Sequence, residues 1–167
     1  INYEVLSVQK KHFGNINLND HFFDSFRSDY QGFDSWFNKK ADELAYVCSY
    51  NDEIRAFLYI KVEDENEDYS DITPTFESKK RLKIGTLKVT LNGIKIGERF
   101  LKIIFDHALH FQVSEIYVTI FEKRPEQKRL MNLFEEFGFK NHGKKNSKNG
   151  EELVYTRDFT GRISGLN

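Results

Sequence analysis

The sequence predicts an α+β fold in a single domain, built from hairpin strands and about four helices. Two observations lead to this class. A chain of 167 residues fits one hydrophobic core. The spacing of apolar residues gives the order helix, helix, three strands, helix, strand, helix and two strands, and the run of three strands excludes a regular strand-helix repeat.

The composition is that of an ordinary globular protein, and it excludes several classes. The 25 basic and 26 acidic side chains give a net charge of -1, so no global field for nucleic acid is present. No stretch reaches the roughly 20 apolar residues of a membrane span, so we expect no membrane partner. The single cysteine, Cys48, excludes an internal disulfide and a cysteine-based zinc site. We therefore expect a reducing, cytoplasmic location and no bound metal.

The first third of the chain predicts two short helices followed by a hairpin. Between residues 18 and 42, aromatic side chains recur every three or four residues, which is typical of helices. Asp20 and Asp34 stand near the expected helix starts, where a carboxylate binds free N–H groups. Two strand-like runs, 44–50 and 54–62, predict an antiparallel hairpin.

The remaining elements follow from apolar patterns and turn residues. The acidic stretch 63–78 predicts a long surface loop. Further on, Asn92-Gly93 signals a turn, Pro125 a helix start and Gly138 a helix stop. The expected elements are a strand at 82–91, a helix at 97–111, a strand at 116–121, a helix from Pro125 to Gly138, and strands at 139–142 and 153–159 around a loop at 143–150.

The junction between the third strand and the following helix is the most informative segment. A strand that ends in a tight turn directly before a helix aims free backbone N–H groups at one point, which suits an anion. Lys95 and Arg99 add positive charge there, which favours a pyrophosphate over a neutral ligand. From these residues alone, an ordinary strand-to-helix turn explains the segment equally well.

At these residues the chain resembles the GNAT superfamily of N-acetyltransferases. In that family the helix after the fourth strand begins with Arg/Gln-x-x-Gly-x-Gly/Ala, and Asn92-Gly93-Ile94-Lys95-Ile96-Gly97 occupies this place. Asn92 and Lys95 depart from the motif, whereas Ile96 and Gly97 agree with it. The segment Leu133-Phe134-Glu135-Glu136-Phe137-Gly138-Phe139 is similar to the family's helix-to-strand ending. The resemblance covers roughly residues 22–159.

The resemblance implies an α/β/α layered form of the fold, with a mixed, mostly antiparallel central sheet. It implies that the central strands splay apart after Leu91 and leave a cleft in which the co-substrate, acetyl-CoA, lies. Backbone amides near Leu87 and Val89 would bind its pantetheine arm and thioester. Its pyrophosphate would be bound by the amides of Ile94, Lys95, Ile96, Gly97, Glu98 and Arg99.

Chemistry in this family is direct attack of an amine on the thioester, which needs a base, a polarised carbonyl and a proton for the thiolate. The family's thiol-protonating tyrosine falls on Phe134, which has no proton to give. The amide residue seven places earlier is Gln127, which either bonds the cofactor arm or is an exposed helix residue. The candidates for the base are Glu122 at a strand end, and Glu63 or Tyr59 acting through water.

Two classes of function stay open. The first is an acyl-CoA-dependent N-acyltransferase that acetylates a primary amine of a small molecule, a protein or an aminoacyl-tRNA. The second is a catalytically silent GNAT-like module that binds acyl-CoA or a protein. An acidic rim formed by loop 63–71 would attract an amine such as a polyamine or a lysine side chain. A basic rim formed by loop 140–149 leaves a nucleic acid such as an aminoacyl-tRNA open without indicating one, and the sequence does not choose between the two. A homodimer also stays open. We expect residues 1–160 to form the domain and 161–167 a tail or linker.

Overall fold

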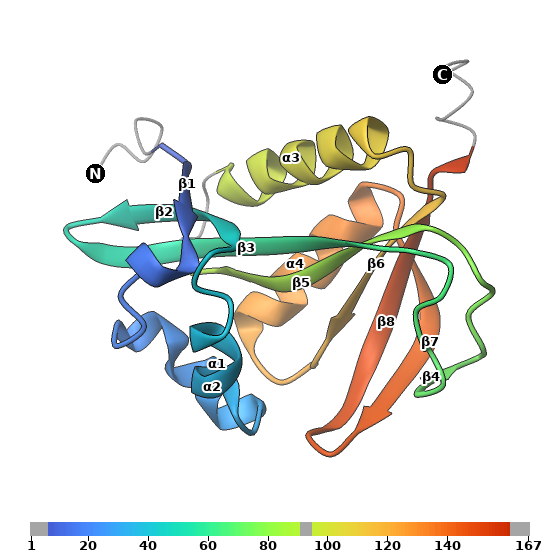
Figure 1. Ribbon diagram of the computed structural model, residues 1–167, viewed down its shortest axis with the longest axis horizontal. Coiled ribbons are helices and arrows are strands. Elements are labelled where there is room, and N and C mark those ends of the chain that lie inside the picture. The colour runs from blue at the N-terminus through green and yellow to red at the C-terminus, as the bar shows by residue number, and fades with distance from the viewer. Residues whose placement is uncertain (1–6, 91–94, 161–167) are drawn as a thin grey trace.

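The computed structural model describes residues 7–90 and 95–160, and an eight-stranded sheet lies at its centre (Figure 1). The strands are β1 Gln9–His12, β2 Leu44–Tyr50, β3 Glu53–Glu63, β4 Ile72–Thr73, β5 Arg81–Val89, β6 Glu115–Ile120, β7 Lys140–Ser147 and β8 Gly150–Asp158. They lie side by side in the order β1-β2-β3-β5-β6-β8-β7-β4. Only β5 and β6 run parallel; the other neighbouring pairs are antiparallel. The predicted α+β class is confirmed.

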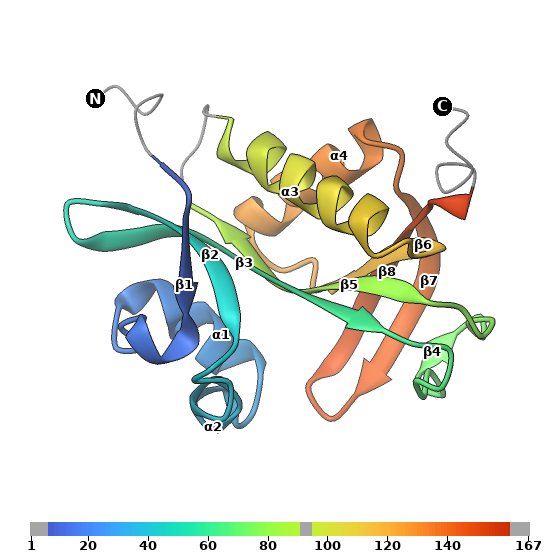
Figure 2. The same ribbon diagram turned by 45° about the horizontal axis from the view of Figure 1, so that its top comes forward.

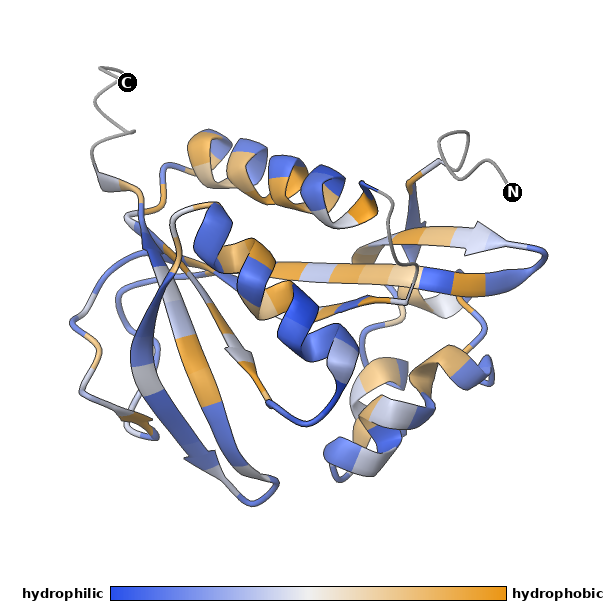
Figure 3. Ribbon diagram, turned by 180° about the vertical axis from the view of Figure 1, so that it is seen from behind, coloured by the Kyte–Doolittle hydropathy of each residue, from blue (hydrophilic) through white to orange (hydrophobic). Residues whose placement is uncertain are grey.

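Helical elements cover both faces of this sheet. They are the short 3-10 turns η2 Phe13–Asn15 and η3 His21–Phe23, and the helices α1 Asp24–Asp29, α2 Phe33–Asn38, α3 Ile96–His110 and α4 Pro125–Glu136. Figures 1 and 2 show α3 and α4 on one face, and the elements from η2 to α2 on the other face beside β1–β3. Along α3 and α4, apolar residues alternate with hydrophilic ones (Figure 3), which is the pattern of a helix that buries one side.

Each face of the sheet has its own hydrophobic core. On the α3–α4 side, fully buried residues such as Phe100, Ile104 and Phe134 pack against the strands. On the other side the core is mostly aromatic, and it includes Phe23 and Phe57. Their rings meet edge to face with centroids 5.4 Å apart, a favourable geometry for aromatic pairs. The aromatic spacing that predicts the two short helices therefore reflects real packing.

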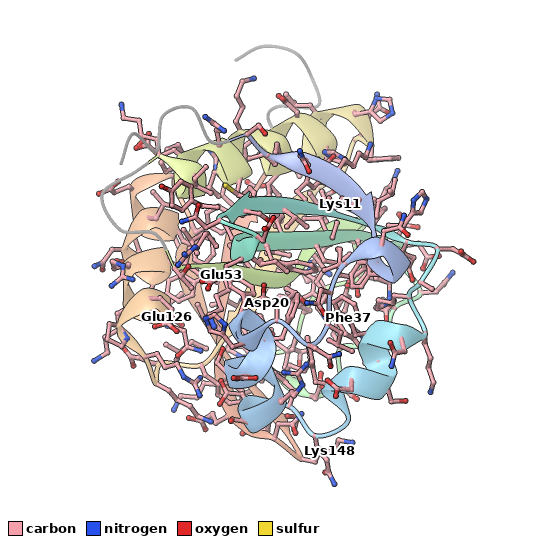
Figure 4. The ribbon with its side chains drawn as sticks, turned by 90° about the vertical axis from the view of Figure 1, so that its left-hand side faces the viewer. Lys11, Asp20, Phe37, Glu53, Glu126 and Lys148 are labelled. Carbon is pink, nitrogen blue, oxygen red and sulfur yellow. The ribbon has the colours of Figure 1, made fainter. Side chains whose placement is uncertain are left out.

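Asp20 fastens the first helical segment to the sheet. Its Oδ1 accepts the N–H of Phe22 at 2.9 Å and so caps η3. Its Oδ2 accepts the N–H of Ile54 at 2.9 Å, at the start of β3. Figure 4 shows Asp20 between the helical segment and the strands. The predicted capping role of Asp20 is confirmed. Asp34 lies in the first turn of α2 as expected, but its Oδ1 accepts Nε–H of Arg27 at 2.8 Å and it does not cap the helix.

The parallel pairing of β5 with β6 is short, and this shapes the site. The two strands are paired only as far as Ile84 and Val118. Beyond that point β5 continues to Val89 beside β3, while β6 continues beside β8. The sheet therefore splays in its middle, as expected, but from Gly85 rather than after Leu91, which lies outside the described residues.

A β-bulge in β5 gives a physical reason for the splay. On β3, Tyr59 pairs with Thr86 while its neighbour Ile60 pairs with Ile84, so Gly85 is an extra residue. A bulge bends its strand and increases the local twist. Gly85 also permits close packing, because a Cβ there would lie 2.8 Å from Cδ2 of Tyr59.

Two predicted loops are partly wrong. The stretch 63–78 buries Tyr69, Ile72 and Phe76 against β6 and β8, and β4 within it pairs with β7. Its charged residues hide this apolar spacing in the sequence. The expected loop 143–150 is mostly strand, because β7 runs to Ser147 and β8 starts at Gly150. The polar strand β7 is largely exposed, so it lacks apolar alternation.

The other predicted elements are confirmed within a few residues. These are the hairpin β2–β3, the strands β5 and β6, and the helices α3 and α4. The polar, largely exposed β1 was not predicted. None of the helices within residues 7–90 and 95–160 is long and apolar enough to cross a membrane.

Candidate active site

A pocket of about 270 Å³ lies where β5 and β6 separate. Its walls come from the diverging strand ends, the α1–α2 region, the start of α4, and residues of β3, β7 and β8. The lining residues that bear on function are Asp29, Tyr30, Tyr59, Lys61, Lys83, Gly85, Thr86, Leu87, Thr119, Gln127, Phe134, Lys145 and Glu152. The pocket thus extends from the α4 side of the sheet to the side on which α1 and α2 lie.

The edge of β5 that faces this opening presents free backbone groups. The N–H of Thr90 donates to the carbonyl of Arg55 on β3 at 2.9 Å. Along an antiparallel pair the direction of the backbone groups alternates, and the register from Tyr59 to Arg55 is continuous. The amides of Leu87 and Val89 therefore point away from β3, toward the side that β6 has left. This is the orientation that the expected role in binding a pantetheine arm requires.

The start of α3 holds most of the residues expected at the pyrophosphate. Ile94 and the turn Asn92-Gly93 lie outside the described residues. Lys95, Glu98 and Arg99 are exposed and Ile96 is buried. A Cβ on Gly97 would lie 2.7 Å from Cδ2 of Leu133, so this glycine allows α3 to approach α4 closely. None of these residues lines the pocket of 270 Å³. The structure places them on the face of the sheet that α3 and α4 cover.

Gln127 and Phe134 project from α4 into the pocket wall. Oε1 of Gln127 accepts the N–H groups of Lys123 and Arg124 at 2.8 and 2.9 Å, so it caps its own helix. Its Nε2 remains as a donor. Phe134 is fully buried against Phe139, with ring centroids 5.1 Å apart. The position expected for a thiol acid therefore carries an apolar ring at the pocket.

Tyr59 lies beside the bulge and joins a polar group at the pocket wall. Its hydroxyl donates to Oε1 of Glu43 at 2.6 Å, and Nζ of Lys40 lies 3.4 Å from the same hydroxyl. Burial and the hydrogen bond to Glu43 raise the pKa of Tyr59. The same bond lowers the pKa of Glu43. At neutral pH, Tyr59 is therefore a neutral donor beside a carboxylate.

The other two candidate bases lie outside the pocket wall. Glu63 is only 4% exposed, and its Oε1 accepts the hydroxyls of Tyr69 at 3.0 Å and Tyr117 at 2.6 Å. Its carboxylate is thus held inside the sheet region by two donors. Glu122 is exposed on the loop between β6 and α4. Of the three candidates, only Tyr59 lines the pocket.

The end of α1 is tied to β8 and to the start of α4 by contacts that sequence reasoning missed. The carboxylate of Asp29 accepts both terminal nitrogens of Arg124, one of them at 3.1 Å. The hydroxyl of Tyr30 donates to Oε2 of the buried Glu152 at 2.7 Å. Burial and the Glu152 carboxylate raise the pKa of Tyr30. The only local sign of these contacts in the sequence is the pair Asp29-Tyr30 before the turn at Gly32, because their partners Arg124 and Glu152 lie about a hundred residues further along the chain.

The tip of the β7–β8 hairpin completes this rim. The N–H of Gln31 donates to Oδ1 of Asn149 at 3.0 Å. Lys148, next in the chain to Asn149, lies beneath the α1–α2 segment in Figure 4. Among the described residues, no group of three His, Cys, Asp or Glu side chains is placed to hold a metal ion.

No family model matches the sequence, and no curated protein gives a significant match. Solved structures do match it. Naa20 from Chaetomium thermophilum, in complex with a bisubstrate analogue, has a TM-score of 0.66 at 14% identity and covers 96% of this chain and 90% of that chain. NAA60 from Arabidopsis thaliana, in complex with acetyl-CoA, has a TM-score of 0.61 at 14% identity and covers 93% and 100%. An acyl-CoA N-acyltransferase from Pseudomonas aeruginosa has a TM-score of 0.52 at 13% identity and covers 91% and 99%.

The chain has the GNAT fold. Its splayed pair β5–β6 is the feature that the resemblance in the sequence implied. The resemblance rested on two short segments, and the turn in one of them lies outside the described residues. The GNAT fold seen here extends that likeness from two motifs to more than nine-tenths of the chain.

Proposed function

We propose that the protein is an acyl-CoA-dependent N-acyltransferase that moves an acetyl group from acetyl-CoA to a primary amine by direct attack. The observation that carries this proposal is the opening of the sheet at Gly85, which turns the amides of Leu87 and Val89 toward a pocket. A structure of NAA60 with acetyl-CoA and one of Naa20 with a bisubstrate analogue share the fold, which supports the same class of co-substrate.

In this proposal the backbone holds the co-substrate. The amides of Leu87 and Val89 bind the pantetheine arm and the thioester, and Nε2 of Gln127 donates to the arm from the opposite wall. The amides of residues 94–99 bind the pyrophosphate at the start of α3, where the helix dipole favours negative charge. Lys95 and Arg99 are exposed there, and their cationic side chains strengthen that preference.

The amine enters from the face on which α1 and α2 lie. Its nitrogen attacks the thioester carbonyl, a C–N bond forms, and the C–S bond breaks as the thiolate leaves. An amide N–H of β5 polarises the carbonyl as charge builds on its oxygen. Tyr59 is the candidate beside the amine. As a neutral phenol, it takes the amine proton through water only as it passes its own proton to the Glu43 carboxylate, to which its hydroxyl donates. The leaving thiolate is protonated by water. Glu63 and Glu122 would need longer water chains, because neither lines the pocket.

A second candidate function is a silent module that binds acyl-CoA. The apolar Phe134 at the position of the thiol acid favours it, because the leaving thiolate then lacks a proton donor on α4. Lys95 at a motif glycine favours it as well. The silent module shares the pocket and the cofactor with the enzyme, and it differs only in turnover.

The test is the rate of CoA thiol release from acetyl-CoA in the presence of a panel of primary amines, with products identified by mass spectrometry. The enzyme proposal expects amine-dependent thiol release and an N-acetylated product. Binding of acetyl-CoA without turnover of any amine would favour the silent module. A Lys148→Gln variant is the matched control, because this lysine is exposed at the hairpin tip.

We also propose a cytoplasmic location, which the single buried thiol of Cys48 supports. Residues 1–160 are proposed to form one domain with a short tail at 161–167, which lies outside the described residues.

A further inference from the structure

Three lysines from three different strands line one end of the pocket. Lys61 of β3 and Lys83 of β5 are directly paired across the two strands, so their side chains share one face of the sheet. Lys145 of β7 also lines this pocket. Their neighbours Ile60 and Ile84 belong to the core under α3 and α4, so the three lysines lie on the opposite, acceptor face. Figure 2 shows the β7–β8 hairpin projecting on that side.

This arrangement is unfavourable without a further partner. Like charges directly opposite on paired strands repel each other. Nζ of Lys61 lies 3.9 Å from Glu63, and Nζ of Lys145 lies 4.0 Å from Asp71, both at the limit of an ion pair. Within residues 7–90 and 95–160, Lys83 has no ion pair. Burial is the largest cause that lowers the pKa of Lys83, and Lys145 and Lys61 lower it further, while the carboxylates of Glu63 and Glu152 partly offset this.

The acidic groups near the cluster are already engaged. Glu63 accepts two tyrosine hydroxyls, and Glu152 accepts the hydroxyl of Tyr30. The two other lysines of the pocket wall, Lys88 and Lys40, are held by hydrogen bonds. Nζ of Lys88 donates to the Phe22 carbonyl at 2.7 Å, and Lys40 bonds Tyr59 and Glu43. Lys40 is thus paired with a carboxylate and Lys88 is held by neutral oxygens, whereas Lys83 of the cluster has neither kind of bond among the described residues.

The cluster lies a short way from the proposed reacting centre. Lys61 is two residues from Tyr59 along β3, which is about 7 Å of strand. A small molecule can therefore reach the thioester with one end and the lysines with the other. A polyamine would meet repulsion at this position.

We propose that the acceptor is a small amine that carries an anionic group, a carboxylate or a phosphate, and that Lys61, Lys83 and Lys145 bind this group. The inference rests on the proposed acyltransferase function and names the substrate class of the same pocket. It differs from a polyamine acceptor, which an acidic rim would attract, since Glu63 of the acidic loop is buried and Oδ2 of Asp71 lies 4.0 Å from Nζ of Lys145.

The experiment uses pairs of amines that differ in the anionic group. Beta-alanine is compared with propylamine, O-phosphoethanolamine with ethanolamine, and spermidine serves as the polycation. Binding of each to the CoA-saturated protein is titrated by calorimetry, and initial rates of thiol release are measured in parallel. We expect the member that carries the anionic group to bind, in at least one pair, about tenfold or more tightly than its partner that lacks this group. The pair that responds distinguishes a carboxylate from a phosphate.

Variants of the lysines test whether this cluster binds the anionic group. For each pair, the affinity of the amine with the anionic group is divided by that of the amine without it. Lys83→Gln and Lys145→Gln are expected to lower this ratio about tenfold, whereas Lys148→Gln leaves it unchanged. The acetyl-CoA affinity of each variant shows whether its fold is retained. Equal affinity within both pairs, tighter binding of spermidine, or no binding of an anionic amine at millimolar concentration would overturn the inference while leaving the acyltransferase proposal standing. A wild-type protein that fails to bind acetyl-CoA contradicts the proposed function itself.

Discussion

At the scale of single residues, the site depends on hydrogen bonds whose strength changes with protonation. Tyr59 and Glu43 are the clearest pair, with the neutral phenol donating to the carboxylate at 2.6 Å. Tyr30 and Glu152 repeat this arrangement across the pocket at 2.7 Å. Both tyrosines have raised pKa values, so neither supplies a phenolate at neutral pH.

The Tyr59–Glu43 bond predicts how stability depends on pH. Tyr59→Phe should lower the free energy of unfolding by about 1 kcal/mol at pH 7, a modest value because Glu43 is half exposed. Because the folded pKa of Glu43 lies below its ordinary value of 4.5, this stabilisation is lost as pH falls through the folded pKa. Because the folded pKa of Tyr59 lies above its ordinary value of 10.0, it is also lost as pH rises above 10.0.

Urea denaturation of the wild type and Tyr59→Phe from acid to alkaline pH measures this difference. A difference that stays constant below pH 4.5 would contradict the role given to the Glu43 carboxylate.

Phe134→Tyr tests the vacant place of the thiol acid. The new hydroxyl would lie at the pocket wall, where it can protonate the leaving thiolate. If breakdown of the thioester limits the rate, kcat should rise about tenfold or more. Phe139→Tyr adds a hydroxyl to the neighbouring ring, which is tilted by 42° against Phe134 and lies outside the pocket wall, and this variant should only be destabilised. Unchanged kcat in a folded, acetyl-CoA-binding Phe134→Tyr protein would show that the proton comes from elsewhere.

At the scale of elements, the bulge in β5 is the feature that opens the sheet, because it lies where β5 and β6 stop pairing. The bulge changes which side chains of β5 point to each face of the sheet. Lys83 lies on the acceptor face, and Thr86, three positions later, lies on the same face. An uninterrupted strand would place these two residues on opposite faces. The single extra residue, Gly85, therefore places Lys83 opposite Lys61 and Thr86 opposite Tyr59, all on one side of the sheet.

Gly85→Ala should destabilise the protein by about 1–3 kcal/mol, because its Cβ would lie 2.8 and 3.1 Å from two ring carbons of Tyr59. The Glu43 bond holds that ring in place. In a Tyr59→Ala background the same substitution should cost much less, and the difference between the two costs is the coupling energy. Chemical denaturation of the four proteins measures it. If Gly85→Ala lowers the free energy of unfolding equally in both backgrounds, the Tyr59 ring is not the cause of the destabilisation.

The elements that the sequence predicted well share a strong apolar pattern. The helix α3 and the strand β6 are examples, since each buries most of one side or both. The start of β7 was predicted as a strand, but its residues 143–147 were predicted as a loop, because polar residues carry no alternation where neither face is deeply buried. Gly85 looked like an ordinary strand residue, since a bulge is visible only in the register with β3.

At the scale of the whole molecule, the sheet lies between the proposed cofactor groups and the proposed acceptor groups. The face under α3 and α4 carries the proposed cofactor groups, and the face beside α1, α2 and the β7–β8 hairpin carries the proposed acceptor groups (Figures 1 and 2). The pocket joins the two faces through the gap between β5 and β6. Resemblance in sequence pointed to the cofactor side, where backbone motifs are local. The resemblance did not reveal the acceptor side, because residues such as Asp29, Lys83 and Glu152 come together only in the folded chain.

The freed edge of β5 is proposed to bind acyl-CoA, and calorimetric titration with acetyl-CoA measures this binding. Proline at residue 89 removes an N–H that faces the opening, whereas proline at residue 88 removes one that faces β3. We predict micromolar binding by the wild type, about tenfold weaker binding by a folded Val89→Pro protein, and loss of the fold in Lys88→Pro. No binding of acetyl-CoA at millimolar concentration by the folded wild type would contradict the account.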